Sequence, residues 1–190
     1  MHTSGAQLVA AYSKGNPKER FTLIYRNYCV FLQVVNSYET GVYNRILCEK
    51  QYNRRQKGAS LEELGVRIQN YRRSDRTANE AIEHVVIQQA IEDCDFAGEL
   101  LKDTDEPEKH MRDILTISVM RQEFEVFASS LGALPPKEKR ITCRYLSKEI
   151  SAAKLAEAED IADQTLRNIL SMTRKTMQEG SMPFFRESIA

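Results

Sequence analysis

The sequence predicts an all-α protein in which a helical bundle is followed by three short helices near the C-terminal end. Apolar residues recur at spacings of three and four along much of the chain, which is the period of an amphipathic helix. Most of the eight glycines and five prolines lie at the ends or between these periodic segments. We find no convincing run of alternating residues that would indicate a strand. With 42% hydrophobic residues among 190, the chain can bury a core.

Four parts are expected along the chain. Residues 1–20 are small and polar and contain Gly5, Gly15 and Pro17, which predicts a flexible arm. Residues 21–132 should form a helical N-terminal domain, and residues 133–180 should form a separate domain of three helices. Residues 181–190 should form a tail.

The segment from Phe21 to about Cys48 predicts a helix with few charges. Its main apolar stripe consists of Ile24, Tyr28, Phe31, Val35, Tyr38 and Val42. Four more apolar residues lie outside this stripe, namely Leu23, Val30, Val34 and Ile46. The helix should therefore be buried on more than one side, either in the core of one chain or in a dimer interface. Gly41 is the expected position of an interruption or kink.

Two capping boxes predict the starts of the next helices. Ser60 with Glu63 should open a short helix from Leu61 to about Tyr71, and residues 72–76 should form a linker. Thr77 with Glu80 should open a helix that extends to about residue 102. Its expected inward face consists of Ile82, Val86, Ala90, Cys94, Ala97 and Leu101.

A further helix is expected between Pro107, which suits the first turn of a helix, and Gly132, which is a stop signal. Its apolar seam has heptad-like spacing and consists of Ile117, Met120, Phe124, Phe127 and Leu131. Such a seam needs an apolar partner.

Residues 134–177 predict three short helices. Pro135 and Pro136 should start the first, and Ser151 should cap the second, which extends from Ala152 to about Glu159. A turn through Asp160 and Ile161 should lead into the third. The expected inward residues are Ile141, Tyr145, Leu146, Leu155, Ala156, Leu166, Ile169, Leu170 and Met177.

This order of helices predicts a helix-turn-helix unit that binds double-stranded DNA. In such units a short second helix braces a third helix, whose first exposed residues enter the major groove. Gln164, Arg167 and Asn168 carry the amide and guanidinium groups that read base edges. The basic side chains expected to contact phosphates are Lys137, Lys139, Arg140, Arg144, Lys154, Arg174 and Lys175.

Residues 134–177 also resemble region four of bacterial RNA polymerase sigma factors. The resemblance lies in Leu134-Pro135, the charged residues 137–140, Arg144-Tyr145, Ser151, Leu155-Ala156, Ile161 and Thr165-Leu166-Arg167. Small phage and mobile-element regulators of the ArpU type look similar in this part. The resemblance covers under a quarter of the chain. It implies that DNA contacts come from the exposed start of the third helix, here Asp163, Gln164, Thr165, Arg167 and Asn168.

The chain departs from that family at the turn before the third helix. Glu159 and Asp160 stand where a Leu-Gly pair is usual, and Asp adopts the left-handed conformation more readily than most residues. Ala162 stands where Ser or Thr would cap the helix, and Asp163 is the expected substitute cap. The rest of a sigma factor's core is not recognisable upstream.

The net charge of zero conceals a segregation of charge along the chain. Residues 45–76 hold nine Lys or Arg against four Asp or Glu, whereas residues 80–125 hold thirteen acidic residues against four basic ones. Solvated helix faces account for this pattern. The alternative is a basic surface for phosphate and an acidic surface for a protein partner.

No residue pattern indicates catalysis, a cofactor or a metal site. The sequence lacks a glycine-rich phosphate loop, paired CxxC motifs and a nucleophile elbow. His84 and His110 lie near Glu80 and Glu108, but the spacing does not suit metal ligands, and we expect surface or rim histidines. Scattered cysteines without an export signal predict reduced thiols that pack in the core. The four are Cys29, Cys48, Cys94 and Cys143.

Taken together, these patterns predict a cytoplasmic DNA-binding transcription regulator of bacterial or phage origin, without enzymatic activity. RNA polymerase and a second copy of the chain are the other partners that the sequence suggests, and no membrane span is expected. The alternative function is a helical interaction or assembly module without specific DNA binding. That module would use the apolar helix of residues 21–48 and the acidic residues 80–125.

Overall fold

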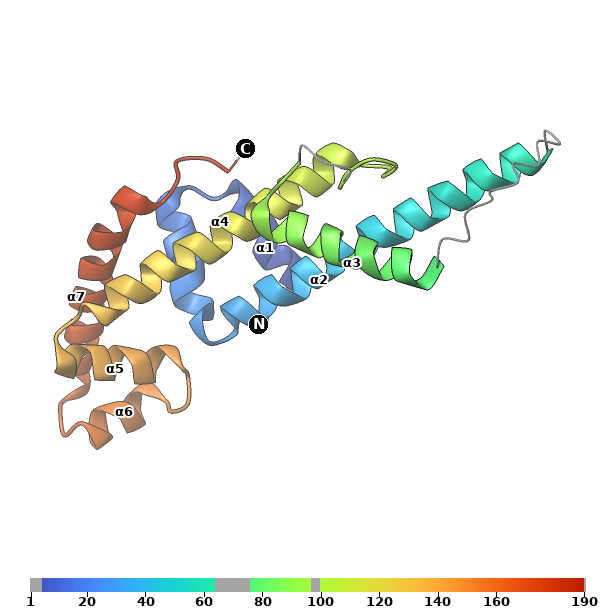
Figure 1. Cartoon of the computed structure of the whole chain (residues 1–190). Helices are drawn as coiled ribbons and strands as arrows, with labels where there is room; N and C mark the ends of the chain where they lie inside the picture. The colour runs from blue at the N-terminus through green and yellow to red at the C-terminus, as the bar shows by residue number, and fades with distance from the viewer. Residues whose placement is uncertain (1–4, 64–75, 97–99, 190) are drawn as a thin grey trace. The chain divides into compact units, whose positions relative to one another are not determined.

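The computed structural model describes residues 5–63, 76–96 and 100–189, and within these ranges every regular element is helical (Figure 1). The first four helices are α1 (Gly5–Lys14), α2 (Pro17–Glu63), α3 (Arg76–Asp93) and α4 (Pro107–Gly132). The C-terminal helices are α5 (Pro136–Leu146), α6 (Ala152–Ala158) and α7 (Asp163–Ser181), followed by the 3₁₀ turn η1 (Met182–Phe184). The predicted all-α class is confirmed.

The chain divides into two compact units whose boundaries differ from the predicted domains. Unit 1 consists of residues 1–36 and 119–190, and unit 2 consists of residues 37–118. The two boundaries lie inside α2 and inside α4. The N-terminal segment and the three C-terminal helices therefore belong to the same unit, which the order of the sequence does not reveal.

Residues 5–14 form α1, although the small, polar sequence of residues 1–20 predicts a flexible arm. Leu8, Val9 and Tyr12 of this helix are buried, and Tyr12 is fully so. A helix of ten residues has little stability by itself, so its formation depends on packing. The apolar residues of the segment were too few to indicate that packing.

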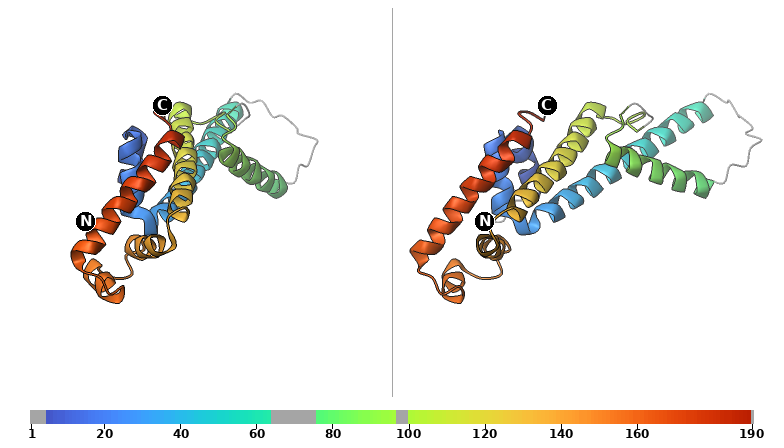
Figure 2. Two further views of the ribbon diagram at one scale, coloured as in Figure 1. Left: turned by 90° about the vertical axis from the view of Figure 1, so that its left-hand side faces the viewer. Right: turned by 60° about the vertical axis from the view of Figure 1, so that its left-hand side comes forward.

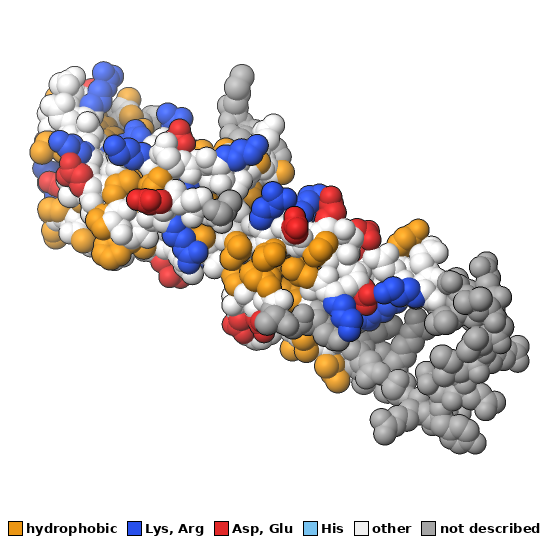
Figure 3. Space-filling model, turned by 90° about the horizontal axis from the view of Figure 1, so that it is seen from above, with side chains coloured by type: hydrophobic (Ala, Val, Ile, Leu, Met, Phe, Trp, Pro, Cys, Tyr) orange, Lys and Arg blue, Asp and Glu red, His pale blue; other side chains and the backbone are white. Residues whose placement is uncertain are grey.

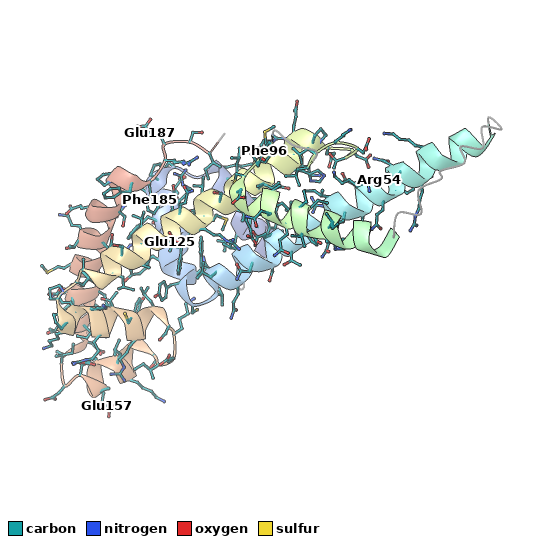
Figure 4. The ribbon with its side chains drawn as sticks, in the orientation of Figure 1. Arg54, Phe96, Glu125, Glu157, Phe185 and Glu187 are labelled. Carbon is teal, nitrogen blue, oxygen red and sulfur yellow. The ribbon has the colours of Figure 1, made fainter. Side chains whose placement is uncertain are left out.

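Aromatic rings form much of the core of unit 1. Phe21 lies 5.2 Å from Phe127, and Phe31 stacks on Phe124 at 5.5 Å between ring centroids. Offset and tilted arrangements at these distances are the favourable ones for aromatic pairs. The predicted stripe of α2 and the predicted seam of α4 therefore meet within this unit. Phe185, after η1, is also buried and lies 6.3 Å from Phe21 (Figure 4), so the predicted tail is anchored.

Helix α2 is longer than predicted and departs from helical geometry at a different residue. Asn27 has φ −114° and ψ 15°, and its side-chain amide donates to the Leu23 carbonyl at 2.9 Å. Gly41, the expected kink, lies within the helix. The basic segment after Cys48 continues the helix to Glu63 because it contains no residue that breaks a helix before Gly58. Two-sided burial is only partial, since Val30 is 37% exposed while Ile46 is buried.

In unit 2, α3 presents a different face to the core from the one predicted. Ile87 and Ile91 are buried, whereas Ile82 and Val86 are 62% and 58% exposed. Helix α3 ends at Asp93, because Cys94 adopts a left-handed conformation with φ 53°. The predicted helix of residues 61–71 and the predicted linker of residues 72–76 lie mostly outside the described residues, as does Ala97. Arg76, the last residue of the predicted linker, is instead the first residue of α3.

Candidate nucleic-acid interface

The three C-terminal helices pack around a shared apolar cluster in unit 1. Its buried members are Ile141 of α5, Leu155 and Ala156 of α6, and Leu166 of α7. Ile150, Ile161, Ile169 and Leu170 pack around them. The three helices have nearly the predicted bounds, and α5 and α6 lie together at one end of α7 in all views (Figures 1 and 2). Tyr145, expected to face inward, is 37% exposed.

The turns between these helices follow the local signals of the sequence. Ser151 caps α6 by accepting a hydrogen bond from the Lys154 amide at 3.4 Å, as predicted. Asp160 has φ 50°, so this residue does adopt the left-handed conformation expected at the glycine position. Ala162 is the N-cap of α7 and has no side-chain cap, while Asp163 lies in the first turn. The expectation that Asp163 caps the helix is therefore wrong. Its carboxylate still lies at the positive end of the helix dipole.

The start of α7 presents a polar surface opposite its buried face. Asp163, Gln164, Thr165, Arg167 and Asn168 are all exposed, and Leu166 among them is 1% exposed. The Gln164 amide donates to the Asn168 side-chain oxygen at 3.1 Å, one helical turn away. These polar side chains project from the exposed side of α7, and the opposite side of the helix packs in the apolar cluster through Leu166. The packing of α7 therefore fixes the backbone that carries the polar side chains.

Two of the predicted phosphate-binding arginines are bound to a carboxylate. Arg144 donates to Glu159 Oε1 at 2.9 Å, and Arg140 donates to Glu159 Oε2 at 2.5 Å. The Glu159 side chain is only 5% exposed, and the Arg140 guanidinium holds the pKa of this carboxyl below its usual range. Glu157, two residues earlier in α6, points away from α5 into solvent (Figure 4). Neither arginine is thus a free phosphate ligand in this structure.

The other predicted phosphate ligands divide into engaged and exposed groups. Arg174 is half-buried, donates to Thr22 Oγ1 at 3.1 Å and lies 5.2 Å from the Tyr25 ring centroid. Its role as a phosphate ligand is not supported by this geometry. Lys175 lies 3.9 Å from Glu179 on the exposed side of α7. The other predicted phosphate ligands are exposed, namely Lys137, Lys139 and Lys154, and Lys139 Nζ donates to the Gly132 carbonyl at 3.4 Å. On the face that Figure 3 draws, basic and acidic side chains are interspersed.

A buried ion pair in unit 1 has no counterpart in the sequence analysis. Arg20 of α2 and Glu123 of α4 pair at 2.8 Å with side chains 0% and 2% exposed. The Tyr12 hydroxyl donates to Glu123 at 2.5 Å, and the Arg186 amide donates to the same carboxylate at 3.1 Å. Arg20 also donates to the Gly15 carbonyl at 2.9 Å. This network joins α1, α2, α4 and the C-terminal segment.

The histidines and cysteines differ in part from the expectations. His110 is fully buried and pairs through Nε2 with Glu49 at 2.8 Å, so it is not a rim residue. His84 is exposed, and its Nδ1 lies 2.7 Å from the Tyr43 hydroxyl. All four cysteines are free thiols. Cys29 and Cys48 are exposed, so the expectation that they pack in the core is wrong. Among the described residues no group of three His, Cys, Asp or Glu could hold a metal ion.

Comparison with known proteins found no match for the chain. No family model matches it, and neither a curated protein nor a solved structure does. None of the helices in the described ranges has both the length and the hydropathy of a membrane-spanning segment.

Proposed function

We propose that α5, α6 and α7 act as a helix-turn-helix unit that binds duplex DNA and regulates transcription. The observation that carries this proposal is the exposed polar start of α7. Gln164, Arg167 and Asn168 project from its first turns, while Leu166 between them is buried against α5 and α6. Amide side chains recognise adenine edges and guanidinium groups recognise guanine edges in the major groove.

The structure separates the basic side chains that are exposed from those that are paired with Glu159, and this limits which of them we propose as phosphate ligands. Lys137, Lys139 and Lys154 are exposed and suited to phosphates, as is the more distant Lys175. The arginines bound to Glu159 instead brace α5 against the end of α6. Few free cations predict modest non-specific affinity, because that affinity scales with the number of phosphates neutralised. Most of the discrimination between sequences should therefore come from α7.

The test begins with selection of bound sequences from a random duplex pool. The double variant Arg167→Ala/Asn168→Ala should lose the preference for the selected duplex over a scrambled one. A specific bidentate contact contributes about 1–3 kcal/mol of discrimination, so the loss should exceed about tenfold. Far-ultraviolet circular dichroism should remain unchanged, because both side chains are exposed.

A matched control removes the same kinds of group elsewhere in unit 1. Lys18→Ala/Gln33→Ala takes away one positive charge and one amide from exposed positions of α2. This control should keep the sequence preference. If the pool yields no enriched sequence, or if the α7 variant binds the selected duplex as the unchanged chain does, the proposal is wrong.

A second candidate function is a helical interaction module, and one observation favours it. Ile82, Val85 and Val86 of α3 are more than half exposed, at 62%, 67% and 58%. Clustered exposed apolar residues are typical of protein contact surfaces. If these α3 residues bind RNA polymerase, the chain would have both functions, binding DNA through α7 and a protein partner through α3. Sedimentation with and without the selected duplex separates the candidates, because a pure interaction module would bind DNA weakly or not at all at physiological salt.

A further inference from the structure

A groove lies within unit 1, where the turn between α5 and α6 faces α2 and α7. Its volume is about 760 Å³. The charged and aromatic residues that line it are Tyr25, Arg26, Tyr145, Lys148, Glu149 and Arg174. Pockets for small ligands typically have volumes of about 300–1,000 Å³ and a few convergent polar groups. The proposed DNA contacts at Gln164, Arg167 and Asn168 are not among the residues that line this groove.

The charge of the groove favours an anion. Arg26, Lys148 and Arg174 contribute three positive charges, and Glu149 is the one carboxylate among the residues that line it. Arg26 and Lys148 are exposed and approach from different elements, one from α2 and the other from the α5–α6 turn. Guanidinium and ammonium groups form charge-assisted hydrogen bonds with carboxylate and phosphate oxygens.

The aromatic side chains add a flat apolar part to the site. Tyr25 and Tyr145 have ring centroids 6.5 Å apart, and they are 8% and 37% exposed. The Arg174 guanidinium lies 5.2 Å from the Tyr25 ring and keeps this wall in place. Tyrosine hydroxyls are protonated at neutral pH, and burial raises the pKa of Tyr25 further, to about 12.

The turn that carries Lys148 is held by hydrogen bonds of its own. The Lys148 amide donates to the Tyr145 carbonyl at 3.3 Å, and Ser147 Oγ donates to the Arg144 carbonyl at 3.0 Å. Lys148 itself has φ 57°, a left-handed conformation. Hydrogen bonds within the turn therefore fix the backbone that carries Lys148.

We propose that this groove binds a small anion attached to a planar aromatic ring, either a nucleoside monophosphate or an aromatic carboxylate. The anionic group would pair with Arg26 and Lys148, and the ring would lie against Tyr145. This inference does not rest on DNA binding. Because the α5–α6 turn forms one wall, such a ligand would also connect α2 to the three-helix cluster.

The test is a calorimetric titration of the full chain. The probes are the four ribonucleoside monophosphates and salicylate. Adenosine, which lacks the charge, and inorganic phosphate, which lacks the ring, serve as controls. At least one charged aromatic probe should bind one to one with a Kd below about 1 mM, and about tenfold or more tighter than both controls. Binding of a nucleotide or of salicylate distinguishes a phosphate from a carboxylate ligand.

Variants then locate the binding. Arg26→Gln and Lys148→Asn should each weaken it by about tenfold, the typical effect of losing a charge-assisted hydrogen bond. Both side chains are exposed, so the fold should persist, and asparagine tolerates the left-handed backbone at residue 148. Lys18→Gln removes a positive charge outside the groove and should leave binding of the aromatic probes unchanged.

Three outcomes would overturn the proposal. The first is that no charged aromatic probe binds. The second is that the Arg26 and Lys148 variants bind as tightly as the unchanged chain. The third is that these variants weaken only the binding of duplex DNA, in which case the groove belongs to the DNA interface. None of these results bears on the sequence preference set by Arg167 and Asn168, so failure here is distinguishable from failure of the proposed function.

Discussion

Arg20 and Glu123 form a buried bidentate ion pair between α2 and α4. Arg20 Nε and Nη2 donate to the two oxygens of Glu123 at 2.9 and 2.8 Å. The same carboxylate accepts the Tyr12 hydroxyl and the Arg186 amide. Burial and the Glu123 charge raise the pKa of Tyr12, so its hydroxyl remains a donor. Residues of α1, α2 and the C-terminal segment therefore meet at one carboxylate of α4, which lies 103 residues from Arg20 in the sequence.

Breaking this pair from one side should be costly. Glu123→Ala leaves the Arg20 charge buried without its partner, and such a loss typically lowers the free energy of unfolding by about 3–5 kcal/mol. Urea unfolding followed by circular dichroism measures the change. Glu106→Ala removes a carboxylate from the exposed pair with Lys109 and should cost far less, because exposed ion pairs contribute little to stability. Equal losses in the two variants would contradict the role assigned to Glu123.

Phe185 should stabilise unit 1 far more than its neighbour Phe184. Phe185 is 6% exposed and lies 6.3 Å from Phe21, whereas Phe184 is 70% exposed. Phe185→Ala should lower the free energy of unfolding by about 3–5 kcal/mol, since it leaves a cavity among aromatic rings. Phe184→Ala should change it by less than about 0.5 kcal/mol. Thermal unfolding of the two variants provides a direct comparison, and similar midpoints would show that the C-terminal segment is not anchored.

The pair between Glu159 and Arg140 should make stability depend on pH. Because the pKa of Glu159 is lower in the folded chain than its usual value of 4.5, the pair stabilises the fold above that pH. This contribution is lost as the pH falls through the folded pKa. The difference in Tm between the unchanged chain and Glu159→Gln should thus be present at pH 7 and shrink below pH 4.5. A difference that stays constant down to pH 3 would contradict the pairing.

Release of the two arginines should also strengthen non-specific DNA binding. Glu159→Gln frees Arg140 and Arg144, whereas Glu157→Gln removes an equal charge from an exposed position of α6 that pairs with neither arginine. Each added phosphate contact should steepen the dependence of log affinity on log salt concentration by about 0.9. Fluorescence anisotropy at several salt concentrations measures the slope. Equal slopes for the two variants would mean that the freed arginines do not reach phosphate.

Loss of the α6 cap should have a small, local effect. Ser151→Ala removes the acceptor for the Lys154 amide and should cost about 1 kcal/mol. Ala153→Gly is the comparison, because it lowers the helix propensity at an exposed position in the first turn of α6 but leaves the Ser151 cap in place. Hydrogen exchange of α6 amides should quicken in Ser151→Ala without change in α2. Unchanged exchange would show that the cap contributes nothing.

Local signals in the sequence determined the all-α class, the bounds of α4 and the three helices between Pro136 and Ser181. The prolines, the Ser151 cap and Asp160 each act on residues close to them in the sequence. The helix boundaries that they set can therefore be predicted from the local sequence. The exposed start of α7 follows from the same helical period.

Only the tertiary structure decided α1, the Arg20–Glu123 pair and the partners of the predicted phosphate ligands. Arg20 and Glu123 are 103 residues apart, and no local pattern reports a contact at that separation. Local patterns likewise do not report the contact of Arg174 with the Tyr25 ring or which side of α3 is buried. A helical period shows which residues share a face, but which face is buried, and which charges find partners, depends on the elements that pack against it.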